Sequence, residues 1–369
     1  MTREQLLEDL YKAYYDARRH KRNKPYQLRF EAHLDENLNQ LCDELLNRTY
    51  KPLVSDCFII NEPKCREVFA AHFRDRVVHH LYFNYTHEMF ERTFIYDSYS
   101  CIKHRGTHFG VNRLRKHILE DSHSYSRPCY VLKMDIRGYF MSIDRHKLLE
   151  IALKTLDKMG NHRVGCHRPT LWKDVVDMDF VRYLTAEIIL LNPIDGCRFI
   201  GPSSDWDNLP YDKSLFHSAA GCGLPIGNLT SQLFSNVYLN VLDQFVKREL
   251  RCKHYGRYVD DFYVVSSDFQ ELCRISDTIK RFLHGELHLV LHEGKTIVRD
   301  IKKGIEFLGA FLLPYRIYIR RTSVLRMAEK ISNMDFNEDP IRYNRAMDSF
   351  CGIMSHWNNF RLRKWVMSC

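Results

Sequence analysis

The spacing of apolar side chains predicts helices and one hairpin in the first ninety residues. Within residues 1–48, leucines and tyrosines recur at helical spacing. They are Leu6, Leu7, Leu10, Tyr11 and Tyr14, followed by Leu34, Leu38, Leu41, Leu45 and Leu46. Residues 72–92 continue the helical pattern, whereas residues 50–70 contain a strand-like apolar run before a turn at Asn61-Glu62-Pro63-Lys64. The chain is therefore expected to begin with helices, a hairpin and a further helix.

The middle of the chain is predicted to hold a short strand, two helices and an irregular stretch. Cys129 to Ile136 is mostly apolar and contains Asp135 near its end, and Asp144 to Leu156 has helical spacing with Asp144 as the N-cap. Residues 157–220 are the least regular part, with a helical pattern only from Phe180 to Leu191. Because turn-forming residues are frequent there, we expect an insertion on the surface of a core fold.

The last part of the chain is predicted to contain a strong amphipathic helix from Ser231 to about Leu250 and then a tight strand–turn–strand. The two flanks of that turn, Tyr255 to Val259 and Phe262 to Val265, are rich in aromatic and β-branched residues, and Asp260-Asp261 lies at the bend. Three further elements follow. They are a helix near 268–284, a hairpin of Ile305 to Leu313 and Arg316 to Arg320 turning at Pro314-Tyr315, and helices over the last 45 or so residues.

Composition places the chain among globular proteins of two or three structural units. It has 369 residues, 45% of them hydrophobic, and no apolar run long enough to span a membrane. The first ten residues do not resemble a secretory signal, and the twelve cysteines include no CxxC pair, so a reducing, cytoplasmic location is expected. His162, Cys166 and His167 come nearest to a metal cluster, but a polar loop is the favoured interpretation.

The net charge of +9 suits a polyanionic partner. Basic residues gather in two zones, of which the first is the denser. The first zone comprises Arg18, Arg19, Lys21, Arg22 and Lys24, and the second Lys103, His104, Arg105, Arg113, Arg115, Lys116 and His117. For the first zone, contact with nucleic-acid phosphates and a solvated charged face are equally favoured.

Three aspartates provide candidate metal chemistry. Asp135 ends one predicted strand, and Asp260-Asp261 lies at the bend of a hairpin 125 residues later. If the two elements are neighbours in one antiparallel sheet, three carboxylates converge, as phosphoryl transfer with two Mg²⁺ ions requires. Asp144 is also acidic and near in sequence, but its expected role is the helix cap.

Five motifs in order make the sequence from about residue 48 to its end resemble reverse transcriptases. They are Lys133-Met134-Asp135-Ile136-Arg137-Gly138-Tyr139-Phe140, Gly223 to Gln232, Tyr258-Val259-Asp260-Asp261, Lys295 in Glu293-Gly294-Lys295-Thr296, and Phe307-Leu308-Gly309. The resemblance implies an α+β right-hand polymerase fold with fingers, an antiparallel palm sheet and a helical thumb. The implied domains are an N-terminal helical segment 1–48, fingers 49–127, a first palm part 128–156, the insertion 157–220, the remaining palm 221–313 and the thumb 314–369.

The resemblance also implies roles for residues around the aspartates. Asp135, Asp260 and Asp261 would hold two Mg²⁺ ions (Mn²⁺ being the alternative), with the carbonyl of Ile136 completing a site, and Lys295 would act near the triphosphate. Further roles fall to two groups of residues. Lys64, Arg66, Arg74, Phe140, Ile226 and Gly227 would contact the nucleotide, with Phe140 as the gate against a 2′-hydroxyl, and Phe307, Leu308 and Gly309 would form the primer grip. Outside the region of resemblance, the basic run makes Arg18, Arg19, Lys21 and Arg22 candidate primer or template contacts. For Arg74, a structural ion-pair network is an equal alternative.

Within the family, Ile226-Gly227 and Ser231-Gln232 are similar to the reverse transcriptases of diversity-generating retroelements, as is the stretch from Asp97 to His108. In that group an apolar residue at the Ile226 position is associated with error-prone copying of template adenines. An antiphage-defence reverse transcriptase is the alternative. No maturase-type extension follows the predicted thumb, so a group II intron enzyme is not expected.

The implied partners are a structured noncoding template RNA, a DNA primer or cDNA product and dNTPs, with an accessory protein or a second copy of the chain also compatible. Two rivals differ in class. A non-catalytic RNA-binding scaffold is disfavoured by the complete set of aspartates, and an RNA-dependent RNA polymerase by Phe140. The sequence leaves open the template, the priming mode, the fidelity, the oligomeric state and the role of residues 157–220.

Overall fold

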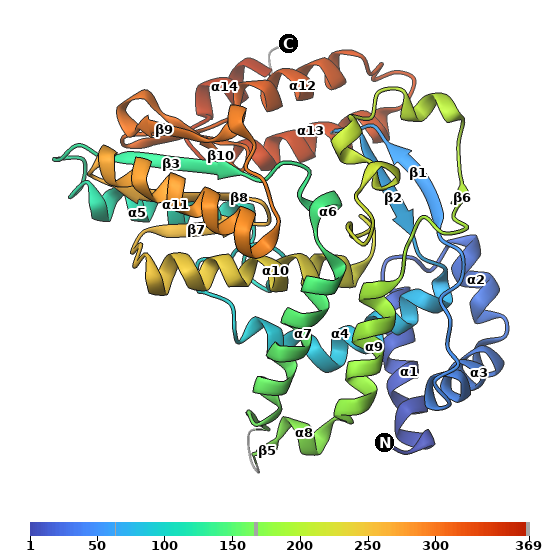
Figure 1. The fold of residues 1–369 in the computed structure, drawn as a ribbon. Coiled ribbons are helices and arrows are strands. Elements are labelled where there is room, and N and C mark those ends of the chain that lie inside the picture. Colours follow the sequence, from blue (N-terminus) through green and yellow to red (C-terminus); the bar gives the residue numbers. More distant parts are fainter. Residues whose placement is uncertain (63, 166–168, 367–369) are drawn as a thin grey trace. The chain divides into compact units, whose positions relative to one another are not determined.

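Contacts divide the chain into two units that are each built from three separate stretches. The computed structural model, drawn in Figure 1, describes residues 1–62, 64–165 and 169–366, so Pro63, Cys166 and His167 of the predictions above lie outside it. Unit 1 comprises residues 1–95, 136–245 and 280–291. Unit 2 comprises residues 96–135, 246–279 and 292–369.

The predicted N-terminal helices are confirmed in unit 1. They are α1 (Arg3–Arg18), α2 (Pro25–Glu31), α3 (Leu34–Leu46) and α4 (Phe73–Glu91). At the start of α1 the Thr2 side chain accepts from the Gln5 amide while the Gln5 side chain accepts from the Thr2 amide, which is a capping box. The apolar face of α1, including Leu6 and Leu10, is fully buried where the helix packs against α3 and α4.

The predicted hairpin of residues 50–70 is also confirmed. Strands β1 (Asp56–Ile60) and β2 (Arg66–Ala70) pair antiparallel, and β6 (Arg198–Phe199) adds to β1 in parallel. Behind this sheet lies a cluster of four buried side chains, which we call the fingers cluster. Its members are Cys57, Phe69, Met141 and Leu215.

Residues 157–220 are more buried than a surface insertion would be. The helix predicted from Phe180 to Leu191 is α9 (Met178–Leu190), and its apolar stripe packs against α4 and α7 (Arg145–Gly160), with Phe180 and Leu184 buried. Further along, the buried carboxylate of Glu67 accepts from the Trp206 indole at 3.0 Å and the Leu215 amide at 2.7 Å. The expectation of a surface segment is therefore wrong for these parts, because long-range contacts that the local pattern does not reveal tie them to β2 and α4.

The other elements of this stretch are short. They are β4 (Arg163–Val164), β5 (Thr170–Leu171), α8 (Trp172–Val175) and 3₁₀ turns at Ser203–Trp206, Tyr211–Lys213 and Leu215–His217. The helix predicted from Ser231 is α10 (Leu229–Gln244), which continues as a π-helical turn over Phe245–Glu249. Asp144 caps α7 as predicted, accepting from the amides of His146 and Lys147.

A four-stranded antiparallel sheet is the centre of unit 2, with the order β7-β8-β3-β9. The strands are β7 (Tyr255–Tyr258), β8 (Asp261–Ser266), β3 (Tyr130–Asp135) and β9 (Ile297–Asp300), and Figure 1 shows β3 and β8 side by side. Helix α5 (Thr107–Asp121) packs on β7 and β8. Val131, Tyr263 and Val265 belong to the core beneath α5. Because side chains alternate along each strand, Lys133, Asp135 and Asp261 share one face of the sheet with each other. Helix α11 (Phe269–Leu287) confirms the helix predicted near 268–284.

The hairpin predicted from Ile305 is a three-stranded meander. Its strands are β10 (Ile305–Phe307), β11 (Ala310–Leu313) and β12 (Arg316–Ile319). The turn at Pro314-Tyr315 is confirmed, but the single strand predicted from Ile305 to Leu313 is wrong. Leu308 and Gly309 have φ of 49° and 83°, so they form a two-residue turn between β10 and β11.

The C-terminal residues are helical, as predicted. They form α12 (Arg321–Ser332), α13 (Pro340–Met354) and α14 (Phe360–Val366). A small core of Ile319, Val324, Phe350 and Met354 joins α12 and α13 to the end of the meander. Across the ranges that the structure describes, each helix is either too short or too polar to cross a bilayer.

Candidate active site

Strand pairing in unit 2 brings two of the predicted aspartates together, Asp135 and Asp261. Asp135 is the last residue of β3 and Asp261 the first of β8, and the two are register partners in the antiparallel ladder. Asp260 precedes Asp261 in the turn between β7 and β8. The adjacency of the two strands, on which the prediction of a carboxylate cluster depended, is therefore observed.

A lysine lies against each of the two paired carboxylates. Lys295 Nζ is 2.9 Å from Asp135 Oδ1, and Lys133 Nζ is 3.2 Å from Asp261 Oδ2. The role of Lys133 was missed by the sequence analysis. The signal was available, because Lys133 stands two residues before Asp135 on the same strand and must therefore share its face.

The surroundings of Asp261 are unusual for a carboxylate. A fifth of its side chain is exposed, yet its Oδ1 atom is buried and has no hydrogen-bond partner. Burial raises the pKa of Asp261 to about 7 against the opposing effect of Lys133, and the charges of Asp135 and Asp260 raise it further. A cation at Oδ1 would satisfy an oxygen that the described protein atoms leave unpaired.

The residues fit a divalent cation by the chemistry of their donors. Carboxylate oxygens are the ligands that Mg²⁺ prefers, and it needs only a few of them because water and substrate oxygens complete its shell. Among the described residues, no three His, Cys, Asp or Glu side chains are grouped closely enough to hold a metal by themselves. The two lysines instead supply the positive charge next to Asp135 and Asp261.

In unit 1, two of the predicted nucleotide contacts lie together. Phe140 and Ile226 both pack against the fingers cluster. The backbone fixes them as well, since the Leu224 amide donates to the Phe140 carbonyl and the Phe69 amide to the Ile226 carbonyl, each at 2.8 Å. Gly227 is left-handed at φ +127°, and a Cβ there would lie 2.8 Å from the Phe69 carbonyl oxygen, so this position requires glycine.

Of the three basic residues predicted to contact the nucleotide, two are exposed and the third is held by other residues. Lys64 and Arg66 are exposed at the end of the β1–β2 hairpin. Arg74 pairs with Glu44, donates to the Lys51 carbonyl at 3.2 Å and lies over the Tyr50 ring. This geometry favours the structural ion-pair network that the sequence analysis gave as the alternative for Arg74.

Comparison with known proteins decides the family. The profile described as reverse transcriptase (RNA-dependent DNA polymerase) matches residues 61–312, more than half of the chain. The chain belongs to the reverse transcriptases. It is accordingly an RNA-directed DNA polymerase of α+β right-hand fold, from a family that binds nucleic acid and acts with divalent metal ions.

Relatives of this reverse transcriptase are distant. Protein YkfC of Escherichia coli (strain K12) is 24% identical over 322 residues, which cover 78% of this chain and 74% of YkfC. The group II intron-encoded protein LtrA of Lactococcus lactis subsp. cremoris is 31% identical over 84 residues, 22% of this chain and 13% of LtrA.

Solved structures similar to this reverse transcriptase include two telomerases. Apo telomerase from Candida tropicalis, truncated from its C-terminal domain, has 12% identity over 75% of this chain and a TM-score of 0.45. Telomerase from Candida albicans in complex with a TWJ fragment of telomeric RNA has 11% identity over 76% of this chain and a TM-score of 0.45. The chain spans 59% and 50% of the lengths of these two telomerase chains.

The predicted primer grip of the reverse transcriptase contacts the sheet that carries the aspartates. The Phe307 ring meets the Tyr263 ring edge-on at 5.1 Å, and Lys133 Nζ lies 6.0 Å from the Phe307 ring centroid. Leu308 and Gly309 form the turn that follows. Ile136, predicted to lend its carbonyl to a metal, is a buried residue of unit 1 that forms an isolated bridge with Leu291.

The first basic zone begins at Arg18, the last residue of α1. Arg18 pairs with Glu31 at 2.9 Å and Arg19 with Asp16 at 3.3 Å. Burial, together with the charge of Arg76, lowers the pKa of Lys21. The residues from Arg19 to Lys24 line a hollow of about 480 Å³, so several cations of this zone face a common space.

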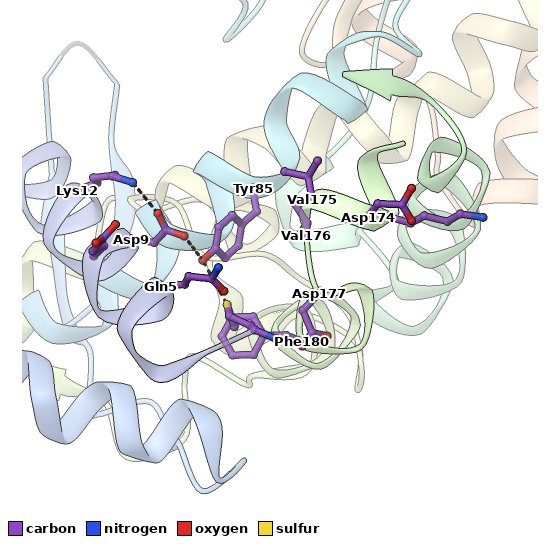
Figure 2. A pocket seen from close by; sticks show the side chains of 12 residues that line it. Gln5, Asp9, Lys12, Tyr85, Asp174, Val175, Val176, Asp177 and Phe180 are labelled. Carbon is purple, nitrogen blue, oxygen red and sulfur yellow. Dashed lines mark hydrogen bonds and ion pairs between the residues drawn. The ribbon is translucent and has the colours of Figure 1, made fainter. Parts of the chain in front are cut away.

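A second hollow of about 500 Å³ lies in unit 1, between α1 and the start of α9, and contains none of the predicted site residues (Figure 2). Its polar groups are largely paired with one another. The Tyr85 hydroxyl donates to Asp9 at 2.8 Å, and Lys12 donates to the same carboxylate at 3.0 Å. Because these charges satisfy each other, this hollow has no evident chemical role in the reverse transcriptase.

Proposed function

We propose that this reverse transcriptase copies an RNA template into DNA with two Mg²⁺ ions held by Asp135, Asp260 and Asp261, Mn²⁺ being the alternative. The observation that carries the proposal is the pairing of Asp135 with Asp261 in one ladder, and the buried Asp261 oxygen without a hydrogen-bond partner supports it. When bound, the ions would activate the primer 3′-hydroxyl and neutralise charge on the triphosphate. The Ile136 carbonyl is a further proposed ligand.

The two lysines have separate proposed roles. Lys295, half exposed beside Asp135, is free to turn toward the leaving pyrophosphate, where it would neutralise charge or donate a proton. Lys133 is more buried and holds Asp261 in orientation from the same face of β3. An ammonium group suits both tasks, because it is a compact charge on a flexible stem.

Nucleotide selection is assigned to unit 1. The Phe140 ring would exclude a ribonucleotide by collision with its 2′-hydroxyl, and Lys64 and Arg66 would hold the triphosphate. Arg74 is left out of this set because Glu44 and the Lys51 carbonyl already engage it.

The finer assignment is a diversity-generating retroelement enzyme. Its support is Ile226, which packs on the fingers cluster beside Phe140 and presents no hydrogen-bonding group. A pocket that recognises shape without hydrogen bonds discriminates weakly between similar bases. The template would be a structured noncoding RNA, the primer a DNA end, and an accessory protein or a second copy of the chain could join them.

Antiphage defence is the second candidate, and the DNA that copurifies with the protein separates the two. Sequencing should give copies of a noncoding repeat with substitutions at adenines if the enzyme diversifies a repeat. Repetitive or concatenated DNA that appears on phage infection would instead favour defence and count against the retroelement assignment.

Removal of the turn aspartates tests the catalytic proposal. Extension of a DNA primer on an RNA template should become undetectable in Asp260→Ala with Asp261→Ala, because the proposed metal ligands are lost. The control is Asp300→Asn. Asp300 lies in β9 and pairs with Tyr130, at the end of β3 away from Asp135, so this variant should retain extension.

Unchanged extension by the doubly substituted protein, with normal thermal unfolding, would sink the two-metal mechanism. Incorporation of rNTPs in preference to dNTPs by the unmodified protein would instead favour an RNA polymerase. If the unmodified protein incorporates no nucleotide, the result would favour a non-catalytic RNA-binding scaffold.

A further inference from the structure

The turn between β7 and β8 contains a strained residue. Val259 has φ of 55°, in the left-handed region that Gly, Asn and Asp adopt far more readily than a β-branched side chain. Strain of this kind persists only where the surroundings hold it, and such residues cluster at functional sites. Because Val259 directly precedes Asp260 and Asp261, its conformation sets the path of both.

Arg257 is the group that holds this turn. Its side chain is fully buried, and its Nη1 atom donates to the Val259 carbonyl at 3.0 Å. A hydrogen bond from a charged donor is stronger than one between neutral groups. The guanidinium also reaches Ser98 Oγ, at 3.5 Å, so it joins the turn to a second segment of unit 2.

The backbone of Arg257 is fixed by that second segment. Its amide donates to the Asp97 carbonyl, and its carbonyl accepts from the Tyr99 amide, both at 2.9 Å, which makes a parallel bridge at Ser98. A Cβ on Gly256 would lie 2.1 Å from the Tyr99 hydroxyl oxygen. Glycine at 256 is therefore needed for Tyr99 to lie this close to β7.

The second segment is itself anchored in the core. The Tyr99 hydroxyl lies 2.8 Å from the Tyr263 hydroxyl and donates to Asp97 Oδ1 at 3.1 Å. Arg113 of α5 grips Asp97 through two hydrogen bonds of 2.6 and 3.0 Å. A rigid network thus supports the strand from which the Arg257 side chain reaches forward to the turn.

The geometry points to Arg257 as a positioning residue for the catalytic turn. It holds Val259 in its left-handed conformation and thereby fixes the backbone that orients Asp260 and Asp261. Arg257 acts through the backbone of the turn, since its side chain is fully buried and donates to the Val259 carbonyl. This inference rests on the proposed function, because the orientation matters only if these aspartates do the chemistry.

Two substitutions test the inference, Arg257→Gln and the more conservative Arg257→Lys, which keeps the charge without the forked donor. We expect kcat for dNTP incorporation to fall by about tenfold or more while KM for dNTP changes by less than about threefold. Amide hydrogen exchange in a peptide covering residues 255–266 should become faster, which reports on the turn independently of activity.

Arg145→Gln is the matched control. Arg145 is also buried and donates to main-chain carbonyls, those of Leu191 and Gly221, but it belongs to unit 1. We expect its substitution to lower the melting temperature without changing exchange in residues 255–266. Faster exchange there in the Arg145 variant, equal to that in the Arg257 variants, would make the effect of Arg257 one of general stability and overturn the inference.

Val259→Gly provides a second test, which remains possible if Arg257→Gln does not fold because it uses Arg257→Lys. Glycine adopts the left-handed conformation without strain, so the loss of kcat on Arg257→Lys should shrink to less than about threefold in the Val259→Gly background. Equal losses in the two backgrounds would overturn the inference, as would unchanged kcat in both Arg257 variants. Extension that survives Asp260→Ala with Asp261→Ala would instead overturn the proposed function, so the two failures are distinguishable.

Discussion

At the scale of single residues, Phe140 and Ile226 owe their placement to the same four buried side chains. Both pack on the fingers cluster, and main-chain hydrogen bonds from Leu224 and Phe69 fix their carbonyls. Neither side chain offers a hydrogen bond. If these two residues contact the nucleotide as proposed, selectivity should therefore depend on side-chain volume.

Phe140→Ala tests this dependence. Removing the ring opens the space that a 2′-hydroxyl would occupy, so incorporation of rNTPs relative to dNTPs should rise by about 10- to 100-fold in primer extension. Phe199→Ala is the control, since Phe199 is a more exposed phenylalanine of the same unit. The same rise in the Phe199 variant, or none in the Phe140 variant, would remove Phe140 from the gate.

At the scale of elements, α5 is joined to the segment that contains Asp97 by a largely buried ionic network. Burial raises the pKa of Asp97, but hydrogen bonds from His117 and Arg113, and their charges, outweigh it and hold that pKa well below its usual range. A carboxyl with a depressed pKa stabilises the fold above its unfolded pKa, about 3.9, and loses that contribution as the pH falls toward the folded value.

Asp97→Asn should therefore destabilise the protein in a pH-dependent way. At pH 7 the free energy of unfolding should fall by about 3 kcal/mol, because Arg113 loses its buried partner. Below about pH 4 the difference from the unmodified protein should shrink as Asp97 itself becomes protonated. Urea unfolding at several pH values measures this.

The control for Asp97 is Asp179→Asn, which removes an exposed ion pair with Arg182 and should change stability by less than about 0.5 kcal/mol. A difference between Asp97→Asn and the unmodified protein that stays constant down to pH 3 would argue against the linkage.

The elements themselves could largely be predicted from periodicity, because most are amphipathic and bounded by turn residues. The break at Leu308-Gly309 could not, since apolar residues continue through a two-residue turn and Leu rarely adopts positive φ. The burial of α9 and the contacts of Glu67 were missed for another reason. They depend on partners in other elements, α4 and α7 for α9 and Trp206 for Glu67, which local spacing does not encode.

Only part of the candidate site could be predicted from the sequence. Adjacent aspartates at a bend and a third at a strand end indicate convergence once the strands pair. The strained Val259 and the buried Arg257 could not be predicted, because neither residue type signals a left-handed turn or a buried guanidinium. Resemblance to a family supplied the roles, and the structure supplied the contacts.

At the scale of the whole molecule, the net charge of +9 raises the question of which basic residues contact nucleic acid. In the zone after α1, Arg18 and Arg19 have acidic partners, whereas Lys21 and Arg22 line the basic hollow. If this zone contacts template phosphates, binding to RNA should be strongly salt-dependent.

Lys21→Glu with Arg22→Glu decides between phosphate contact and a solvated face. The slope of log affinity for single-stranded RNA against log salt should become shallower by about 1.4, corresponding to two lost contacts. Lys154→Glu with Lys158→Glu, two exposed lysines of α7, is the control with the same change of charge. Equal shifts for the two pairs would mean that only net charge matters.

The division of each unit into three stretches of chain has a consequence for synthesis on the ribosome. Strand β3 is made early, but its neighbour β8 emerges more than 120 residues later and β9 later still. Until then β3 has no ladder partner, and an unpaired apolar strand is a template for aggregation. Nascent chains of this enzyme should therefore need chaperone protection through most of translation, and a product truncated before residue 261 should be inactive and insoluble.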